Sequence, residues 1–392
     1  MIKKTNFILF LFLSVIIVRA QKLDVSLYSD YSIKSFVLTP VEGKYLLFGD
    51  SVFIDTLRPT DIIHLSLDST KISVKSLDEI FLSYTNVEIR GVEGITNVFK
   101  IKPVVPTAAE RIYTDGLFLH ELNGRILILN RVKLENYVAG VVETEGGSKA
   151  SKEYYKTQAI LCRTYALENW HRHELEGFNL CDGVHCQAYK SKCKHNPEIQ
   201  IATEETKGLV IVDTSMTLIT AAFHSNSGGY TANSEDVWVL AKPYLRSVRD
   251  EYWSKGRNAH WSKEIEVDQW KRYLKSYGFN LSGNETAQSF AYQQKTRDSY
   301  YRYAGDKLEL KTIRYDWRLK STFFDLVPRG NKLVIEGRGY GHGVGLSQEG
   351  AMRMSDMGFP YDKIIKYYYK NVYIVNTEAI DFFKSDSLNY KK

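Results

Sequence analysis

The sequence predicts an α+β fold with an antiparallel β-rich core and a helical hairpin that has a glutamate on its apolar side. Three observations support this class. Short runs of alternating apolar and polar residues fill the first hundred positions, apolar residues at helical spacing follow between 134 and 170, and β-type runs alternate with helical ones towards the C-terminus. With 392 residues and 44% hydrophobic composition, the chain can bury one large core or two joined cores.

Residues 1–20 have the pattern of a cleavable signal peptide. Two lysines precede an apolar stretch from about Phe7 to Val18, and Ala20 is a small residue at its exit. We therefore expect an exported protein of the periplasm or cell envelope. An uncleaved anchor is the alternative, because Arg19 is unusual beside a cleavage site. No later apolar run is long enough to cross a bilayer.

The charged residues are spread along the chain, which argues against a dedicated nucleic-acid surface. There are 52 lysines and arginines against 46 aspartates and glutamates, a net charge of +6. This balance permits contact with an anionic polymer. Some of the 27 tyrosines could stack on sugar rings, because a sugar has an apolar face, but most lie in strand-like or core-like runs.

Residues 21–105 are predicted to form a β-rich N-terminal region. Period-two runs broken by Gly, Pro and Asp are typical of antiparallel strands, and they are DVSLYSDY, SFVLTP, KYLLFGD, IIHLSL, KISVKSL, NVEIRGV and VFKIKPV. The prolines between Pro103 and Arg111 mark the best boundary, so we expect a second region over 106–376 and a loose tail over 377–392. A hairpin is predicted around Asn123-Gly124.

Two helical patterns joined by a glycine break occupy residues 134–170. Apolar residues of the first pattern form one stripe; they are Leu134, Tyr137, Val138, Val141 and Val142. Glu145 falls on this stripe, whereas Glu143 projects from another face and can stay in water. Because charge is poorly solvated on a packed side, we expect the pKa of Glu145 to rise towards the range of a general acid. The alternative is a simple ion pair between Glu145 and Arg163.

The break between the two helices is expected at Gly146-Gly147, and Ser148 or Ser151 can cap the second helix. The second pattern places polar Gln158 among core-type neighbours. Cys162 on the same helix is predicted to be a small core residue.

The segment after the second helix is rich in cysteine and histidine. His173, Cys181, His185 and Cys186 could form a tetrahedral zinc site of the structural type, although the spacing is not that of a standard finger. In an exported protein the competing interpretation is a disulfide, with Cys193 available to pair with Cys181 or Cys186. A secreted zinc hydrolase centred on His185 would need an open metal position, and no helix-borne pair of histidines supports it.

A run of small and hydroxyl residues follows a hairpin predicted over GLVIVDTSMTLITAAFHS. Such a run, from His224 to Gly229, suits a loop whose backbone approaches a ligand. A serine nucleophile with His224 as base is the alternative. Adjacent side chains of a strand point to opposite faces, so His224 cannot readily activate Ser225. We therefore assign Ser225 and Ser227 to substrate contact or to the turn.

The last third combines a predicted helix, a long polar loop and a glycine-rich block. VDQWKRYLKSYGF has a helical pattern, SGNETAQSFAYQQKTRDSYYRYAGDK is expected to be an insertion or specificity loop, and two strands flank Arg329-Gly330-Asn331. Five glycines then surround His342, which either lines a cleft or is structural. His342 occupies the position that a third glycine would need in a dinucleotide fingerprint. A final helix is expected from Tyr361 to Tyr373.

Several of these blocks together resemble the sporulation stage II protein D family, also called the amidase-enhancer family. They are GVVETEG…KTQAILCRTYAL, CDGVHCQAY, HSNSGGYTANSEDVW with PYLRSVRD, and GRGYGHGVGLSQEGA, in the family's order. The resemblance implies that residues 106–376 are a catalytic domain with Glu145 as the catalytic glutamate, and that some relatives bind a metal. The Met-Pro and Trp-Pro pieces that often follow this glutamate are missing here.

The activity that the resemblance implies is that of a peptidoglycan lytic transglycosylase, a lyase acting on glycan strands stripped of stem peptides. No cofactor is then required for catalysis, and one carboxylate suffices. Gln158, Arg163, Tyr189, Ser225, Ser227, His342 and Gln348 are candidates for orienting the substrate or setting the pKa of Glu145. The expected partners are glycan strands and a cell-wall amidase. The alternative is a noncatalytic glycan-binding enhancer of that amidase.

Overall fold

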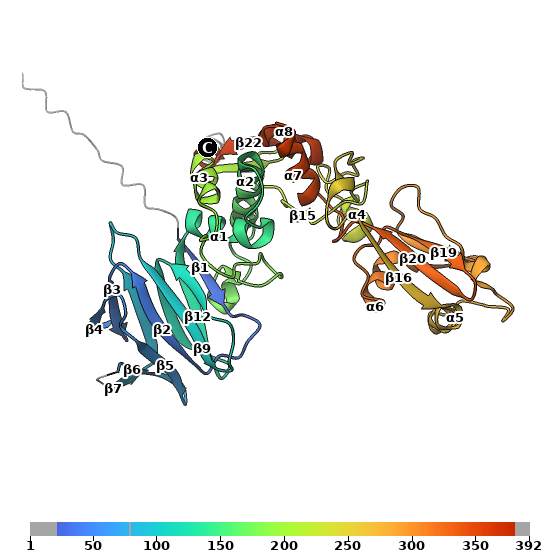
Figure 1. Cartoon of the computed structure of the whole chain (residues 1–392). Helices are drawn as coiled ribbons and strands as arrows, with labels where there is room; N and C mark the ends of the chain where they lie inside the picture. The colour runs from blue at the N-terminus through green and yellow to red at the C-terminus, as the bar shows by residue number, and fades with distance from the viewer. Residues whose placement is uncertain (1–21, 78–79, 381–392) are drawn as a thin grey trace, which may run out of the picture.

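The computed structural model describes residues 22–77 and 80–380, and Figure 1 shows its three parts. A β structure built from the first strands stands beside a group of helices, and a smaller lobe lies on the other side of those helices. This arrangement confirms the α+β class. The predicted signal peptide and most of the predicted tail fall outside the described residues.

Two sheets form the β structure. One has the order β13-β1-β12-β11-β8-β3-β4 and the other β10-β9-β2-β5-β6-β7. The strands are β1 (Lys22–Leu27), β2 (Ser35–Glu42), β3 (Tyr45–Gly49), β4 (Val52–Leu57), β5 (Ile63–Asp68), β6 (Lys71–Lys75), β7 (Ile80–Tyr84), β8 (Asn86–Gly91), β9 (Val98–Val105), β10 (Arg111–Thr114), β11 (Gly116–Leu122), β12 (Arg125–Lys133) and β13 (Leu180–Cys181). Buried side chains of both sheets join one core, as the alternation in the sequence predicts.

The turn between β11 and β12 is the predicted one. Asn123 and Gly124 have φ values of 52° and 71°, which is the left-handed geometry that a two-residue hairpin turn needs. Strand pairing, however, crosses the boundary predicted at residue 106. β12 pairs with β1 along its length, and β10 pairs with β9. The parts on either side of residue 106 therefore share both sheets.

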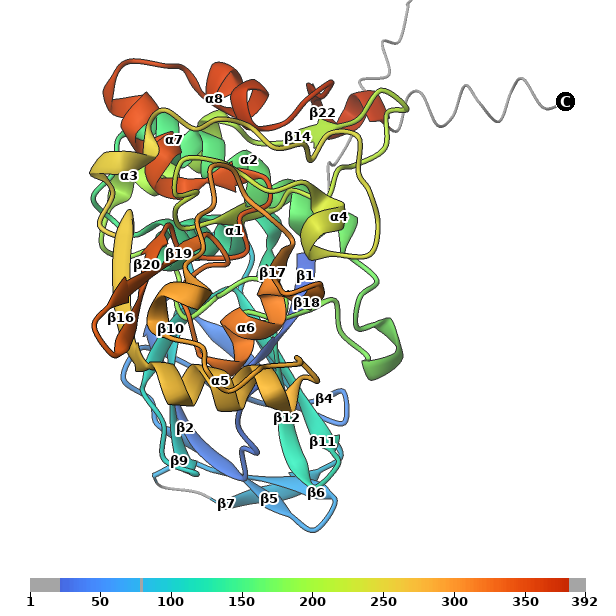
Figure 2. The ribbon, with the colours of Figure 1, turned by 90° about the vertical axis from the view of Figure 1, so that its right-hand side faces the viewer.

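The helices gather at one end of the β structure (Figure 2). They are α1 (Leu134–Gly146), α2 (Lys152–Glu168), α3 (Pro197–Glu205), α7 (Gln348–Asp356) and α8 (Tyr361–Tyr368). α1 begins directly where β12 ends. All five residues of the predicted apolar stripe on α1 are buried, which confirms that stripe. No helix within the described ranges is long and apolar enough to cross a membrane.

Three sequence predictions are corrected in this region. Ser151 occupies the N-cap position of α2, but its hydroxyl contacts Ser355 instead of capping the helix. The predicted hairpin after residue 208 closes only at its turn, through a bridge between Val212 and Leu218. Its strands pair elsewhere: β14 (Leu209–Val212) with β22 (Tyr373–Asn376), and β15 (Phe223–His224) with β21 (Leu346–Ser347). The last helix accordingly stops at Tyr368, and the chain returns as a strand.

Residues 260–338 form most of the lobe, which has its own hydrophobic core. Its elements are β16 (His260–Glu266), α5 (Val267–Ser276), β17 (Tyr300–Tyr303), β18 (Asp306–Glu309), α6 (Leu310–Asp316), β19 (Phe324–Arg329) and β20 (Lys332–Arg338). The predicted helix and the two predicted strands are confirmed. The long polar loop is wrong as a loop, because Phe290 and Tyr301 from it are buried in the core of the lobe.

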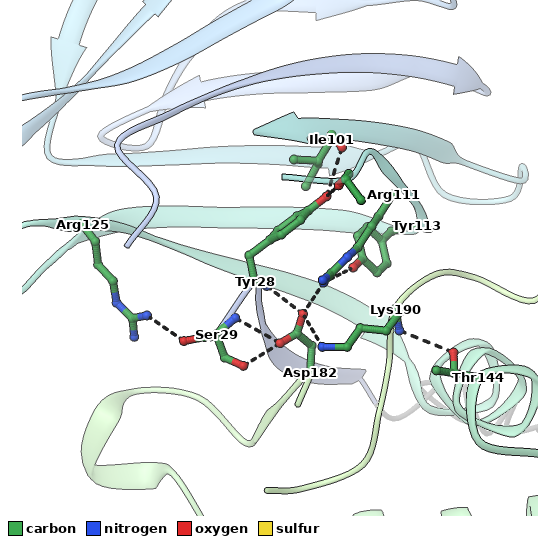
Figure 3. A network of polar contacts seen from close by, with 10 residues as sticks. Tyr28, Ser29, Ile101, Arg111, Tyr113, Arg125, Thr144, Asp182 and Lys190 are labelled. Carbon is green, nitrogen blue, oxygen red and sulfur yellow. Dashed lines mark hydrogen bonds and ion pairs between the residues drawn. The ribbon is translucent and has the colours of Figure 1, made fainter. Parts of the chain in front are cut away.

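A buried carboxylate, Asp182, fastens the segment after α2 to the β structure (Figure 3). Asp182 is fully buried and accepts hydrogen bonds from the backbone N–H groups of Tyr28 and Ser29. The Arg111 guanidinium donates to it at 2.6 Å, and the Lys190 ammonium lies 3.8 Å away. Because Tyr28 and Ser29 directly follow β1 and Arg111 lies on β10, the carboxylate fixes this segment to the β structure.

We predict that Asp182→Ala destabilises the protein strongly. The substitution leaves the Arg111 guanidinium, only 13% exposed, without its anion, and breaking a buried pair in this way costs about 3–5 kcal/mol. Glu336→Ala removes an exposed pair with Arg329 and should cost less than about 1 kcal/mol. Urea unfolding of both variants measures the difference. Equal losses of stability would contradict the anchoring role of Asp182.

Candidate active site

Glu145 lies in the last turn of α1, where the helix meets the glycine break. The break is at the predicted place, since α1 ends at Gly146 and Gly147 has a φ of 71°. A Cβ on Gly146 would lie 2.9 Å from the Tyr154 hydroxyl of α2. Glycine therefore lets the end of α1 approach α2 closely enough to bring Glu145 against the second helix.

The Glu145 carboxyl is half-buried and has one hydrogen bond donor, the backbone N–H of Ala188 at 2.7 Å. Burial raises the pKa of Glu145 above its ordinary value, and this outweighs the lowering by the Ala188 N–H and by the nearby Lys190 charge. The direction is the one that the apolar stripe predicts. A carboxyl of this kind keeps a proton at a pH where an ordinary glutamate has lost it.

A cluster of polar side chains lies beside Glu145 inside the helical part. The amide Nε2 of Gln158 lies 3.6 Å from the Cys162 sulfur, and Gln187 is close enough to this thiol to lower its pKa. The charge of Glu145 acts on both Cys162 and Tyr154, which raises the pKa of each further. Glu145, Tyr154, Gln158, Cys162 and Gln187 are therefore neighbours; we call these five residues the Glu145 cluster.

Three buried polar atoms of the Glu145 cluster have no hydrogen bond partner among the residues that the structure describes. They are the Tyr154 hydroxyl, the Oε1 of Gln158 and the Nε2 of Gln187. Buried polar groups are nearly always paired, so an unpaired donor and acceptor side by side indicate a place for water or for a ligand's polar atoms. Gln187 and Tyr154 were not predicted as site residues. The signal for Gln187 was its position in the CDGVHCQAY block, between residues that were singled out.

Arg163 and Tyr189 lie away from the Glu145 carboxyl. The Arg163 guanidinium is fully buried and donates to Glu135 of α1 at 2.9 and 2.5 Å, and to the carbonyl oxygens of Leu209 and Thr203. The alternative of a Glu145–Arg163 pair is therefore wrong. The ring of Tyr189 is fully buried, and its hydroxyl donates to Asn130. Both residues support the helices and the sheet beneath the site.

Glu143 is held differently from what its position on the helix predicts. Its carboxylate accepts hydrogen bonds from the backbone N–H groups of Lys194, His195 and Asn196, at 2.8 to 3.1 Å. It is therefore fixed by a turn of the following segment and does not stand free in water.

The loop after β15 runs alongside the glycine-rich block and pairs with it at two isolated bridges. The glycine-rich block leads to Gln348, which contacts Glu145. Gln348, at the start of α7, donates from Nε2 to the Glu145 carbonyl oxygen at 3.2 Å. The Ser227 hydroxyl is buried and donates to Asp250 at 2.7 Å, while Ser225 accepts the Glu349 N–H through its backbone carbonyl. The structure therefore brings Gln348 next to Glu145 and uses Ser227 inside the loop.

His224 and His342 form a pair beneath this loop, with ring centres 5.6 Å apart. Nδ1 of His224 lies 3.1 Å from the Val344 carbonyl oxygen, which fixes it as the donor, and Nδ1 of His342 accepts from the Val344 N–H. Burial lowers the pKa of His342 to about 4, with Arg314 as a second cause, and it lowers the pKa of His224 as well. His224 therefore stays neutral, and among the described residues no hydrogen bond joins it to Ser225.

The four predicted metal ligands lie together. One ligand atom each from His173, Cys181, His185 and Cys186 falls within a group whose members are all within 4.8 Å of one another. The Cys186 sulfur lies 3.4 Å from Nε2 of His173 and 3.9 Å from Nδ1 of His185. A tetrahedral zinc ion holds sulfur and nitrogen ligands roughly 3.5 Å apart, so these residues fit zinc.

Two further features bear on these four candidate metal ligands. Nδ1 of His173 contacts the Glu176 carboxylate at 2.5 Å. In zinc sites a carboxylate commonly binds the other ring nitrogen of a histidine ligand in this way and orients the ring. The four cysteines are free thiols, and the Cys193 sulfur lies next to Glu143 and Asn196, 3.5 Å from each partner atom.

A second carboxylate does not act on Glu145 within the part of the chain that the structure describes. The groups that shift its pKa besides burial are the Ala188 N–H and Lys190. The buried carboxylate of Asp250 is engaged by Ser227 and by the Tyr252 N–H. A hydrolytic glycosidase generally needs two carboxylates about 5 to 10 Å apart, so the arrangement favours chemistry that uses one.

A profile of the family described as Stage II sporulation protein matches residues 122–212. This part contains α1, α2 and the four candidate metal ligands. Stage II sporulation protein D of Bacillus subtilis (strain 168) is 30% identical over 268 residues, covering 64% of this chain and 77% of that protein. The protein of the same name from Bacillus amyloliquefaciens is also 30% identical, over 271 residues, covering 64% of this chain and 76% of that protein.

A third relative has a different name. The amidase enhancer of Bacillus subtilis (strain 168) is 26% identical over 346 residues, which covers 72% of this chain and 48% of the enhancer. The similarity therefore extends over most of this chain but over about half of that longer protein.

We predict opposite effects on stability when the two acidic residues of α1 are changed to glutamine. Folding raises the pKa of Glu145, so ionisation at neutral pH opposes folding, and its favourable contribution is complete only below the ordinary value of 4.5. Glu145→Gln should therefore be more stable than the wild type at pH 7, and the difference should shrink as the pH falls towards 4.5.

Glu143→Gln is the matched control on the same helix. It loses a carboxylate that accepts three backbone N–H groups and should be destabilised by about 1–3 kcal/mol at pH 7. Thermal unfolding at several pH values measures both variants. A Glu145→Gln protein that is less stable than the wild type at neutral pH would contradict a raised pKa at Glu145.

Proposed function

Because the chain belongs to the stage II sporulation protein D family, we propose that it is a peptidoglycan lytic transglycosylase with Glu145 as its single acid and base. The observation behind this proposal is a half-buried glutamate of raised pKa, next to unpaired buried polar atoms, on which no second carboxylate acts among the described residues. The substrate class is the glycan strand of peptidoglycan, stripped of its stem peptides, and the bond is that between N-acetylmuramic acid and N-acetylglucosamine.

The proposed reaction uses the same carboxyl twice. Protonated Glu145 gives its proton to the bridging oxygen, the glycosidic bond breaks, and the electron pair leaves with the N-acetylglucosamine hydroxyl. The C6 hydroxyl of the muramic acid then attacks its own anomeric carbon, and the Glu145 carboxylate takes the proton of that hydroxyl. The anhydro ring closes, and Glu145 is again protonated for the next cycle.

The neighbours of Glu145 give this reaction its physical basis. Burial raises the pKa of the carboxyl, which favours its protonated form, and the Ala188 N–H holds one oxygen in place without a full positive charge. Gln348 fixes the backbone at Glu145 through its carbonyl oxygen. The unpaired amide atoms of Gln158 and Gln187 offer one acceptor and one donor, which suits a buried water molecule.

We also propose that the protein is exported and acts in the periplasm or cell envelope. The support is the signal-peptide pattern of residues 1–20 and a substrate that lies outside the cytoplasm. Ser225 and His342 line the path from the lobe to Glu145 in this proposal, while Arg163, Tyr189 and Ser227 support it from within.

A structural zinc ion is proposed at His173, Cys181, His185 and Cys186. When bound, the metal cross-links the segment between α2 and α3, and four protein ligands leave it no open position for catalysis. This segment also contains Gln187 and Ala188, so the ligands fix the backbone that donates to Glu145. The four-ligand arrangement gives no support to a zinc hydrolase centred on His185.

The second candidate function is that of a noncatalytic amidase enhancer. The observation that favours it is the similarity over 72% of this chain to a protein named amidase enhancer. In that case the chain binds glycan or an amidase, and Glu145 is dispensable.

We predict that Glu145→Gln abolishes the release of anhydromuramyl ends from amidase-stripped peptidoglycan, with a loss of about 100-fold to 10,000-fold because the acid and base are one group. Mass spectrometry of the soluble products measures it. Glu204→Gln, which removes an exposed carboxylate 58% accessible on α3, is the control and should keep full activity. Release by neither wild type nor control, with faster amidase action when the protein is added, would favour the enhancer.

We predict one tightly bound zinc ion per chain. Elemental analysis of the purified mature protein should find it, and Cys181→Ala and His173→Ala should each lose it, whereas Cys193→Ala should keep it. Chelation should lower the unfolding temperature, since the ligands close a long segment. Two reactive thiols per denatured, metal-free chain, where four are expected from the sequence, would indicate a disulfide and contradict the zinc site.

A further inference from the structure

A group of cationic side chains surrounds His342 at the junction of the lobe and the glycine-rich block. Arg314 lies in the last turn of α6. Lys320 comes shortly after this helix, and its carbonyl oxygen accepts the Gly341 N–H at 3.0 Å. Arg297 comes from the segment before β17, and its guanidinium lies over Gly343, where a Cβ would meet it at 2.6 Å. We call Arg297, Arg314 and Lys320 the cationic group.

The two arginines of this group have no carboxylate partner among the described residues. Arg297 donates to the carbonyl oxygens of Tyr230 and Ser227 and to the Thr322 hydroxyl, all of them neutral. Arg314 donates through Nε to the Leu319 carbonyl oxygen at 3.3 Å. Its two terminal nitrogens have no hydrogen bond partner within the described part of the chain, although the side chain is half-buried.

Three other half-buried or buried arginines of the same protein are neutralised by a carboxylate. Arg163 pairs with Glu135, Arg111 with Asp182, and Arg338 with Asp325. A buried charge without a partner is costly. Arg297 and Arg314 lie next to each other without such a partner, and an anionic ligand would neutralise them.

The pKa values of Arg297 and His342 agree with a region of positive charge that no carboxylate neutralises. The pKa of Arg297 falls to about 9, first because of burial and then because of Arg314 and Arg338. After burial, Arg314 is the next cause that lowers the pKa of His342. No carboxylate acts on Arg297, Arg314 or His342 in the described residues.

Two aromatic rings stand open beside these cations. Trp238 is 38% exposed and packs on His342 with ring centres 5.3 Å apart. Tyr340 is 44% exposed, and the Lys320 ammonium lies 5.8 Å from its ring centre. Aromatic faces next to cations form the combination that recognises a sugar bearing an acidic group, because the ring packs on the sugar and the cation pairs with the anion.

This surface is connected to Glu145 by a short piece of backbone. The glycine-rich block runs from His342 to Gln348, which contacts Glu145, and six residues span at most about 21 Å. A glycan strand bound at Glu145 can therefore reach the cationic group with sugars that follow the one being cleaved.

We propose that Arg314 and Lys320, positioned by Arg297 and flanked by Trp238 and Tyr340, form a subsite for the free lactyl carboxylate of a peptide-stripped N-acetylmuramic acid. The assignment rests on the proposed function, because it takes the glycan strand as the ligand. When a stem peptide is attached, this carboxylate is a neutral amide. The subsite thus accounts for a preference for stripped strands, since only these present the anion to the guanidinium.

The test measures binding in the Glu145→Gln background, so that it needs no turnover. The ligands are amidase-stripped glycan strands and the same strands after conversion of their lactyl carboxyls to methylamides. Arg314→Gln should weaken binding of the stripped strands about tenfold or more and leave the amidated strands unchanged. Arg314→Lys should restore part of the affinity, and Arg272→Gln, an exposed arginine on α5, should have no effect.

Three results would overturn the subsite. They are equal binding of stripped and amidated strands, an unchanged affinity of a folded Arg314→Gln protein, and equally tight, Arg314-dependent binding of strands that keep their stem peptides. The last result would identify stem-peptide carboxylates as the anion. If wild-type protein forms no anhydro ends while Arg314-dependent binding persists, the proposed reaction fails and the subsite stands.

Discussion

The close approach of α1 to α2 at Gly146 is the constraint on which the candidate site depends. α1 leaves β12 without a loop, so the sheet fixes where the helix starts and its length fixes where it ends. At that end Glu145 is pressed against α2, which withdraws water from its carboxyl and raises the pKa. The buried Arg163–Glu135 pair locks the two helices together, so the position of the acid follows from ordinary packing.

Two other segments contact Glu145, and different interactions hold each of them in place. The cysteine and histidine segment delivers the Ala188 N–H and Gln187, it is anchored by Asp182, and it contains the four candidate zinc ligands. The glycine-rich block delivers Gln348 and is supported by β21 pairing with β15. Glu145 is therefore surrounded by residues from distant parts of the chain.

The sequence allowed the strands, the hairpin at Asn123-Gly124, the apolar stripe of α1 and the four clustered ligands to be predicted. Each depends on local periodicity or on residue types with few alternatives. Two contacts could not be predicted from the sequence: the pairing of β14 with β22, and the hydrogen bonds of Glu143 to residues 194 to 196. Both join segments that are far apart in the chain. Arg163 stood out as a charge near the site, but its partner Glu135 lies in the first turn of α1, at the other end of the helix from Glu145.

The central claim is that one carboxyl performs the reaction because the substrate's own C6 hydroxyl takes the place of water. The most direct test is to let the wild-type protein act on amidase-stripped strands in water enriched with heavy oxygen and to weigh the new muramyl ends. Closure of an anhydro ring takes no oxygen from the solvent, so the account predicts ends without heavy oxygen. Ends that carry heavy oxygen from the moment they are formed would show hydrolysis and contradict the account.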